Sequence, residues 1–389
     1  MSILPLTDQQ REVQQLARDF AAAEIAPFAE RWDRDACFPI AVARKMGELG
    51  FLGMLLPEEY DGLALDTRSY LLALEEIAAA DASTAVLMSV HNSLPTQMIL
   101  HFGSAEQKER YLRPMARGEM IGAFALSEPE AGSDASAVRC QAVRAADGSG
   151  WSLTGTKSWV TSGTFADAII VMARTDTPDA RRGSKGISAF IITPDLPGFR
   201  VGKKEDKMGL RASPTVQLNF DGMHVPDANL LGEEGQGFVY AMRSLDNGRL
   251  GIAAQALGIA RASLDASLDY AAERQQFGQP IKDFQAIQFK LADMASRIAS
   301  ARALLHLTAA AKDRGESTTL YGSMSKLLAS ETAMWAATQA VQIFGGYGYV
   351  KDYPVERYFR DAKITEIYEG TSEIQRIVIA RELYAERAN

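Results

Sequence analysis

The spacing of apolar residues divides the chain into three parts. In the first part, hydrophobic side chains recur every three or four positions, as in Val13, Leu16, Ala17 and Phe20. This period predicts amphipathic helices. Further helices are expected over residues 40–49, 69–80, 83–100 and 106–115. Residues 1–122 are therefore predicted to form an N-terminal helical domain.

The second part contains short β-branched or alternating runs that are separated by Gly, Pro and Asp turns. These runs predict strands over residues 151–154, 168–173, 187–193 and 215–220. The run Ala168–Met172 is apolar throughout, and its length and branching favour a strand. The polar stretch 175–185 is expected to be a loop. Residues 123–232 are predicted to form a middle β-barrel or sandwich domain.

Helical periodicity returns in the third part, in long Ala-rich segments. The predicted helices cover residues 239–245, 250–274, 284–313, 320–344 and 374–386. Four long helices suggest a C-terminal four-helix bundle, assigned to residues 233–389. The order helix, strand, helix excludes alternating βαβ units, so the predicted fold class is α+β.

Composition narrows the function classes. The 389 residues are 47% apolar and 23% charged, as in ordinary globular proteins. A net charge of -8 disfavours a nucleic-acid binder. Cys37 and Cys140 lie far apart without metal-ligand spacing, which favours a reducing, cytoplasmic location without a disulfide. No basic n-region precedes an apolar run, and no window approaches a membrane span, so no membrane association is expected. The four histidines are scattered, and no metal site is predicted.

The candidate general base is Glu369, in the stretch Tyr368–Thr371. Gly370 tolerates a turn, and Ser372 and Gln375 have capping-box spacing, so a helix is expected to begin at Thr371 or Ser372. A carboxylate on such a turn is exposed for chemistry. The residues alone leave open that Glu369 is an ordinary loop glutamate.

Other stretches carry polar or aromatic groups in turns. The turn 124–134 has a hydroxyl at either end, Ser127 and Ser133, and is also typical of an ordinary connection. In 157–163, Trp159 suits either a flat ring or core filling. Arg274 could hold a diphosphate, whereas the pair of charges in 245–249 is most simply a salt bridge.

Taken together, these stretches resemble the acyl-CoA dehydrogenase family, most closely its short-chain, butyryl-CoA type members. The resemblance implies a helical domain, a β domain and a four-helix domain with FAD between them. It implies FAD contacts at Phe124, Leu126, Ser127, Ser133, Trp159, Thr161, Arg274, Phe277, Gln285, Gln342, Gly345, Gly346, Thr371 and Glu373. It implies substrate contacts at Ser133, Asp246, Arg249 and Gly370, with Arg249 suited to the nucleotide end of CoA.

The activity that the resemblance implies is α,β-dehydrogenation of a short- or medium-chain acyl-CoA, straight or branched, to the trans-2-enoyl-CoA. Glu369 removes the α-proton, Thr161 lies near flavin N5, and a backbone N–H at the base clamps the thioester carbonyl together with a ribityl hydroxyl. Burial is expected to raise the pKa of Glu369. The pocket floor is expected within residues 89–98, at His91, Leu94, Pro95 and Met98.

Related enzymes provide a check and several alternatives. Some family members carry the base immediately before the arginine of the Leu-Asp-x-x-Arg stretch, where this chain has Gly248, so Glu369 is the matching base. The resemblance further implies a homotetramer, electron-transfer flavoprotein as acceptor, and a place in fatty acid β-oxidation or branched-chain amino acid degradation. The alternatives are an acyl-CoA oxidase, a relative of nitroalkane oxidase, and a non-catalytic CoA-binding scaffold.

Overall fold

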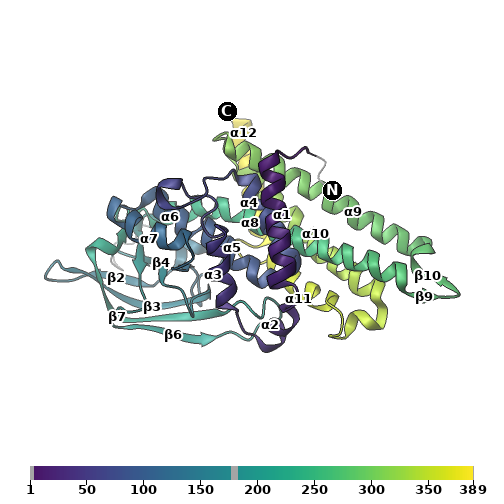
Figure 1. Ribbon diagram of the computed structural model, residues 1–389. Coiled ribbons are helices and arrows are strands. Elements are labelled where there is room, and N and C mark those ends of the chain that lie inside the picture. The colour runs from purple at the N-terminus through teal and green to yellow at the C-terminus, as the bar shows by residue number, and fades with distance from the viewer. Residues whose placement is uncertain (1–3, 177–182, 389) are drawn as a thin grey trace.

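The computed structural model describes residues 4–176 and 183–388. Helices, a sheet and helices again follow one another along the chain (Figure 1). The α+β class and this order are therefore confirmed. The limits 1–122, 123–232 and 233–389 stay predictions, but the element type changes between residues 116 and 122 and between 231 and 237. Residues 177–182 of the predicted loop lie outside the described part.

Helices make up the N-terminal part. They are α1 (Asp8–Phe20), with a π-helical turn at Ala21–Ile25, α2 (Ala29–Asp35), α3 (Ile40–Glu48), α4 (Thr67–Ala80), α5 (Ala82–Ser93), α6 (Pro95–Phe102) and α7 (Ala105–Ala116). The prediction of one helix over residues 83–100 is wrong. Leu94 leaves the helical region with φ -112° and ψ -80°, and α6 starts anew at Pro95. A proline fits the first turn of a helix because it has no N–H to donate there.

Strands make up the middle part. They are β1 (Gly122–Ala125), β2 (Gln141–Arg144), β3 (Gly150–Thr161), β4 (Ala168–Arg174), β5 (Ile187–Ile192), β6 (Phe199–Lys204), β7 (Thr215–Pro226) and β8 (Leu230–Leu231). They form one sheet with the order β6-β7-β3-β2-β4-β5-β8, and β1 pairs with β4 in parallel.

Both faces of the central strands are buried, which explains why β4 is apolar throughout. Ile169 and Val171 face a core that also holds Trp151 and Phe190. Ile170 and Met172 face a second core that includes residues of α6 and α7. A strand with two buried faces carries a continuous apolar run instead of an alternating one.

Long helices make up the C-terminal part. They are α8 (Gly237–Glu273), α9 (Gln285–Asp313), α10 (Thr319–Phe344), α11 (Val355–Thr365) and α12 (Ser372–Ala388), with a small hairpin of β9 (Gln275–Gln276) and β10 (Gln279–Pro280). The prediction of separate helices over 239–245 and 250–274 is wrong, because α8 is continuous through Gly248. The sequence reading also missed α11.

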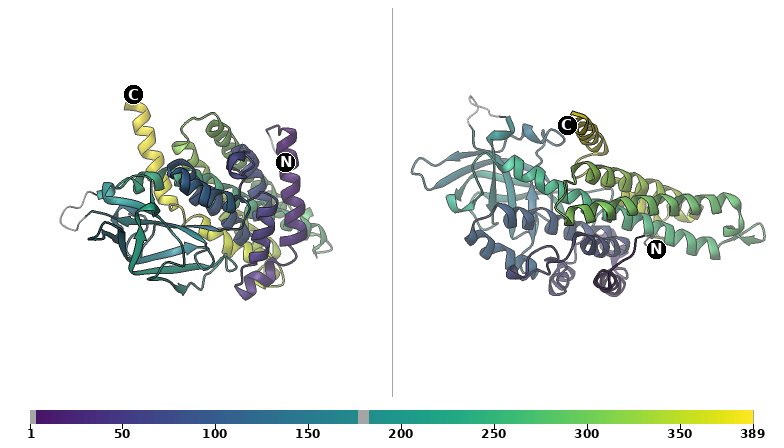
Figure 2. Two further views of the ribbon diagram at one scale, coloured as in Figure 1. Left: turned by 60° about the vertical axis from the view of Figure 1, so that its left-hand side comes forward. Right: turned by 90° about the horizontal axis from the view of Figure 1, so that it is seen from above.

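The three parts pack against one another, and helix α8 extends along most of the molecule (Figure 1). The β domain lies at one end of the molecule, the β9–β10 hairpin lies at the other, and α8 begins beside the sheet and runs toward the hairpin (Figures 1 and 2). Helices α8, α9 and α10 contact one another, and α4 and α5 contact α8. No helix in the described part is long and apolar enough to cross a membrane.

Candidate active site

Glu369 lies in the short connection between α11 and α12, in an unusual backbone conformation. Its φ is +52°, and Gly370 follows with φ +93°. A non-glycine residue with positive φ is uncommon, and such residues cluster at functional sites where the surroundings hold them. The Nε2 atom of Gln375 donates to the carbonyls of Gly370 (2.9 Å) and Glu369 (3.3 Å). The first turn of α12 therefore holds the Glu369–Gly370 turn in place.

The start of α12 is partly as predicted. The helix begins at Ser372, and the Thr371 hydroxyl accepts from the backbone N–H of Ile374 (3.3 Å). The predicted capping box of Ser372 and Gln375 is wrong. The Gln375 amide donates to the turn instead, and the Ser372 hydroxyl is buried without a hydrogen-bond partner in the described part of the chain.

The carboxylate of Glu369 is buried. Neither of its oxygens has a hydrogen-bond partner among the described residues. Burial raises its pKa from 4.5 to about 7, and the positive charges of Lys326 and Arg249 act in the opposite direction. This bears out the expected direction of the shift. The group therefore sits near the pKa that suits a general base at neutral pH.

Helix α8 makes room for this carboxylate at Gly248. A Cβ atom built on Gly248 would lie 2.1 Å from Glu369 Oε2. Glu369 therefore reaches from its own turn to the surface of α8 at Gly248.

One turn farther along the same face, α8 meets the N-terminal helices. A Cβ atom built on Gly251 would lie 2.4 Å from the hydroxyl of Ser89 and 3.1 Å from that of Tyr70. Both hydroxyls are buried. Residues at i and i+3 share a helix face, so these hydroxyls lie next to the site of Glu369 along α8. Ser89 is the first residue of the range predicted for the pocket floor.

His91, also in that range, has a structural role. Its Nε2 lies 3.2 Å from the Met115 carbonyl, and its Nδ1 accepts from the backbone N–H of Gly122 (3.0 Å). Burial lowers its pKa to about 4, so the ring is neutral. It connects α5 to the end of α7 and to β1. Leu94, Pro95 and Met98 are buried too, and their contact with an acyl chain stays a prediction.

Arg249 is buried beside the candidate base. Its Nη1 donates to Asp246 Oδ1 (2.5 Å) and to the Ser323 hydroxyl (3.3 Å). Asp246 Oδ2 also accepts from the Thr319 hydroxyl (3.0 Å). The guanidinium is thus part of an internal network between α8 and α10. Its contact with the nucleotide end of CoA stays a prediction.

The backbone N–H of Glu369 pairs with no acceptor among the described residues. It therefore suits the predicted clamp on a thioester carbonyl. The neighbouring Tyr368 hydroxyl donates to Gln255 Oε1, and Gln255 Nε2 donates to the Ala82 carbonyl (2.8 Å). This chain of hydrogen bonds ties the turn to α8 and α5.

On the β domain, Trp159 is presented to the outside. It is 61% exposed, has φ +62°, and lies where the register between β3 and β7 shifts. The alternative of core filling is therefore wrong. Ser158, the preceding residue, donates its backbone N–H to the Ser127 carbonyl (2.8 Å). This hydrogen bond joins the two stretches that were predicted to face the flavin.

A buried ion pair also joins the turn after β1 to strand β3. Lys157 Nζ donates to Glu128 Oε1 (2.7 Å) and to the Leu126 carbonyl (2.9 Å). Glu128 also accepts from the backbone N–H groups of Arg139 and Cys140. Removal of one partner from such a pair costs about 3–5 kcal/mol. The turn after β1 is therefore rigidly fixed to β3, with Ser133 exposed beyond it.

Residues of β1, of α8 and of the turn before α12 contribute to the hydrophobic cores near the site. Phe124 in β1 and Leu245 in α8 each pack against both the helical core and the core under the sheet, and Tyr368 packs against the helical core. Leu245 lies about one helical turn before Gly248. Phe124 of β1 and Leu245 of α8 thus both lie at the boundary between these two cores.

Six other predicted FAD residues form a second group, at the far end of the molecule, whereas Thr371 and Glu373 lie at the start of α12 beside Glu369. The six residues of the second group lie in or beside the β9–β10 hairpin, at the start of α9 and at the end of α10, and they are Arg274, Phe277, Gln285, Gln342, Gly345 and Gly346. Phe277 is 94% exposed, and Arg274 lies over the ring of Tyr347. The β domain is at the opposite end in all views (Figures 1 and 2). Within one chain the structure does not bring the two groups together.

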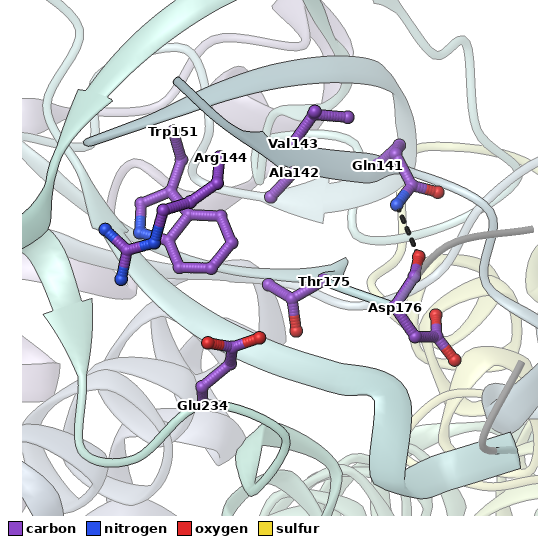
Figure 3. Close-up of a pocket in the computed structure, with 8 residues that line it drawn as sticks. All are labelled: Gln141, Ala142, Val143, Arg144, Trp151, Thr175, Asp176 and Glu234. Atoms are coloured by element: carbon purple, nitrogen blue, oxygen red, sulfur yellow. Dashed lines mark hydrogen bonds between the residues drawn. The ribbon is translucent and has the colours of Figure 1, made fainter. Parts of the chain in front are cut away.

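A separate surface pocket lies on the β domain, over β2 and the start of β3. Figure 3 shows the residues that line it: Gln141, Ala142, Val143, Arg144, Trp151, Thr175, Asp176 and Glu234. Gln141 Nε2 donates to the Asp176 carbonyl (2.7 Å), and Arg144 stacks over Trp151. None of the predicted catalytic, cofactor or substrate residues lines this pocket.

Sequence reasoning missed Lys326, Gln255 and Tyr70, which surround the turn of Glu369. Lys326 is fully buried in α10. One signal was present in the sequence, because this lysine lies in a helical segment of small and apolar residues. Gln255 and Tyr70 carried no signal, since polar residues on helices are usually solvated.

Models of the acyl-CoA dehydrogenase family match nearly the whole chain. The N-terminal domain matches residues 7–119, the middle domain residues 123–223, and the C-terminal domain residues 235–384. The chain belongs to the acyl-CoA dehydrogenase family. It is therefore an oxidoreductase of a family that uses FAD.

Individual relatives match the chain over 90% or more of their own length. The mitochondrial short-chain specific acyl-CoA dehydrogenase of Mus musculus is 53% identical over 98% of this chain and 90% of its own. The structure of butyryl-CoA dehydrogenase from Megasphaera elsdenii is 45% identical, with a TM-score of 0.95 over 98% of this chain and 99% of that one. A chain in a structure described as the electron transferring flavoprotein of Acidaminococcus fermentans is 48% identical, with a TM-score of 0.95 over 98% and 99%.

The residues of this acyl-CoA dehydrogenase fit the family's cofactor. Trp159 offers an exposed indole beside Thr161, and glycines at 345 and 346 leave the backbone open, because a Cβ atom on either would meet nothing within 4 Å. An aromatic face suits a flat ring system, and open backbone suits close approach of a phosphate.

We predict that Gly248→Ala impairs catalysis without unfolding the protein. The added methyl group meets the flexible end of Glu369, so the carboxylate moves while the helix gains an alanine. A misplaced reacting group lowers the rate by about ten- to a hundred-fold. The measurements are flavin reduction by butyryl-CoA and the thermal unfolding midpoint.

Gly322→Ala in α10 is the matched control. Its Cβ would meet only Leu250 Cδ2 at 3.7 Å and the Asp246 carbonyl at 3.9 Å, which are ordinary contacts. This variant should keep wild-type activity. Equal rates for the two variants would contradict the placement of Glu369 against α8.

Proposed function

We propose that the chain oxidises a short-chain acyl-CoA, straight or branched, to the trans-2-enoyl-CoA and passes the electrons to an electron-transfer flavoprotein. The observation that carries the proposal is the buried carboxylate of Glu369, which has no hydrogen-bond partner among the described residues and lies against Gly248 of α8. The family supplies the reaction class, and the named relatives are a short-chain specific acyl-CoA dehydrogenase and a butyryl-CoA dehydrogenase. A place in fatty acid β-oxidation or branched-chain amino acid degradation belongs to the same proposal.

Glu369 acts as the base in this proposal. The α-C–H of a thioester is a weak acid, so its proton is removed by a carboxylate that is already desolvated and aligned. The unpaired backbone N–H of Glu369 donates to the thioester carbonyl and stabilises the negative charge that develops there. Asp246, Arg249, Ser133 and Gly370 are proposed as further substrate-side residues.

FAD, when bound, supplies the hydride acceptor for the β-carbon. Three groups of residues are proposed to hold it. The β-domain group is Phe124, Leu126, Ser127, Ser133, Trp159 and Thr161, the hairpin-end group is Arg274, Phe277, Gln285, Gln342, Gly345 and Gly346, and the α12 group is Thr371 and Glu373. Thr161 is placed near N5 in this arrangement.

The separation of the first two groups supports an oligomer. The hairpin end lies too far from the β domain of its own chain to complete that site (Figure 1). It therefore completes the site of another subunit, and we propose a homotetramer. Exposed aromatic side chains such as Phe277 and Tyr349, 94% and 89% exposed, suit burial at such a boundary.

Purified protein tests the function and its two rivals in one experiment. We expect a yellow protein that oxidises butyryl-CoA and reduces an electron-transfer flavoprotein or a dye. Stoichiometric hydrogen peroxide at full turnover would show an acyl-CoA oxidase instead. Protein that stays colourless after incubation with FAD would show a scaffold. A panel of acyl-CoA substrates from C4 to C12, including branched chains, establishes the preferred substrate.

The variant Glu369→Gln tests the base. It keeps the size of the side chain but removes the proton acceptor, so flavin reduction by butyryl-CoA should fall by at least about a thousand-fold. FAD content, measured from absorbance, should stay at the wild-type value. Near-normal reduction with FAD bound would show that another group is the base.

The pH profile follows from the ionisation of Glu369. Only the ionised carboxylate accepts a proton, and burial raises its pKa to about 7. The value of kcat/KM should therefore rise about ten-fold per pH unit below that pKa and level off above it. The measurement is kcat/KM for butyryl-CoA between pH 5.5 and 9.5, in steps of about half a unit. A flat profile over this range would contradict the raised pKa.

A further inference from the structure

Lys326 is a buried lysine whose charge the mechanism above does not use. Its side chain is 0% exposed, in the middle of α10. A buried ammonium group costs several kcal/mol unless other groups compensate it. Within the described part of the chain, no carboxylate oxygen lies within 4 Å of it, and its one hydrogen bond goes to the Gly370 carbonyl (2.8 Å). The burial of this ammonium group therefore calls for an explanation from the groups around it.

The hydrogen bond of Lys326 ends on the catalytic turn. The Gly370 carbonyl accepts from Lys326 Nζ on one side and from Gln375 Nε2 (2.9 Å) on the other. Glu369 and Gly370 both have positive φ, a conformation that persists only when the surroundings hold it. Helices α10 and α12 thus hold the same peptide group. These two hydrogen bonds to the Gly370 carbonyl restrain the turn that carries both the carboxylate and the backbone N–H of Glu369.

The charge of Lys326 also faces the carboxylate of Glu369. From α8, Arg249 also acts on this carboxylate, but it is paired with Asp246 at 2.5 Å. The neutral hydroxyls of Tyr70 in α4 and Tyr368 in the turn are the other titratable groups near it. Glu366 and Glu373 act on Lys326 from farther away. Lys326 is therefore the cation without a close counter-ion at this site.

We propose that Lys326 is a positioning residue of the dehydrogenation. Its ammonium group anchors the Glu369–Gly370 turn through the Gly370 carbonyl and favours the ionised form of the neighbouring buried carboxylate. The proposal rests on the proposed role of Glu369 as the base. Burial disfavours the ionised carboxylate, and a fixed cation nearby favours it without forming a contact that the substrate must break.

The test compares wild type with Lys326→Met and Lys326→Arg. Methionine keeps an unbranched apolar side chain and removes the charge and the donor, whereas arginine keeps both. The measurement is the rate of flavin reduction by butyryl-CoA from pH 5.5 to 9.5, without oxygen. Loss of one cation near a buried carboxyl group raises the pKa of that group. The pH at which the rate of flavin reduction reaches half of its plateau (the acid limb of the pH–rate profile) should therefore rise by about one unit in Lys326→Met. At pH 7 the rate then falls about five-fold, and most of this loss is recovered at pH 9.

Lys312→Met is the matched control. Burial lowers the pKa of Lys312 to about 8, as it does for Lys326, but Lys312 lies near Asp313 and His101 instead of Glu369. Its pH profile should equal that of wild type. Lys326→Arg should also keep the wild-type position of the acid limb.

The outcomes separate the two proposals. If Lys326→Met lowers the rate equally at every pH, or not at all, the charge role of Lys326 is wrong. If Lys326→Met does not fold or binds no FAD, Lys326→Gln is measured in the same way and must show the shifted limb. If Glu369→Gln keeps its activity, the base itself is wrong. A dead Glu369→Gln together with a wild-type profile for Lys326→Met overturns only the inference about Lys326.

Discussion

The burial of the Glu369 carboxylate determines which groups can surround it in this site. A shift of the pKa of Glu369 from 4.5 to about 7 corresponds to roughly 3 kcal/mol against ionisation. The fold bears this cost because a base that is hydrogen-bonded to the protein would have to break that bond before it took a proton. The surroundings therefore supply charge at a distance, from Lys326 and Arg249, and no direct donor in the described part of the chain.

Close helix packing makes the dry site possible. Along α8, glycines 248, 251 and 258 lie where a Cβ would meet the side chain of Glu369, the hydroxyls of Ser89 and Tyr70, and the backbone of α4. These small residues let the base turn and the N-terminal helices approach the same helix. Because α8 is continuous, the carboxylate of Glu369 and the hydroxyls of Ser89 and Tyr70 lie along the same face of this helix. A bend at Gly248 would separate them.

The β domain is rigidly held near the base, and the hairpin end lies at the opposite end of the molecule (Figure 1). The buried pair of Lys157 and Glu128 fixes the turn after β1 to β3, so the exposed face of Trp159 has a defined position. The hairpin with Phe277 lies at the other end of α8. In the proposed homotetramer, cofactor binding and assembly are linked, because the hairpin end of each subunit is proposed to complete a neighbour's site.

The sequence by itself determined the order of helices and strands, the family, and the candidate base, because periodicity and short motifs are local properties. It also determined that Gly248 could not be the base. Local reasoning failed where context overrides propensity: it broke α8 at Gly248, joined α5 to α6 across Pro95, and gave Gln375 a capping role. Only the tertiary structure placed Lys326 at Gly370, because residues 44 positions apart meet through packing that no local pattern encodes. It also decided that the carboxylate oxygens of Glu369 are buried and have no hydrogen-bond partner among the described residues, since burial depends on every helix around them.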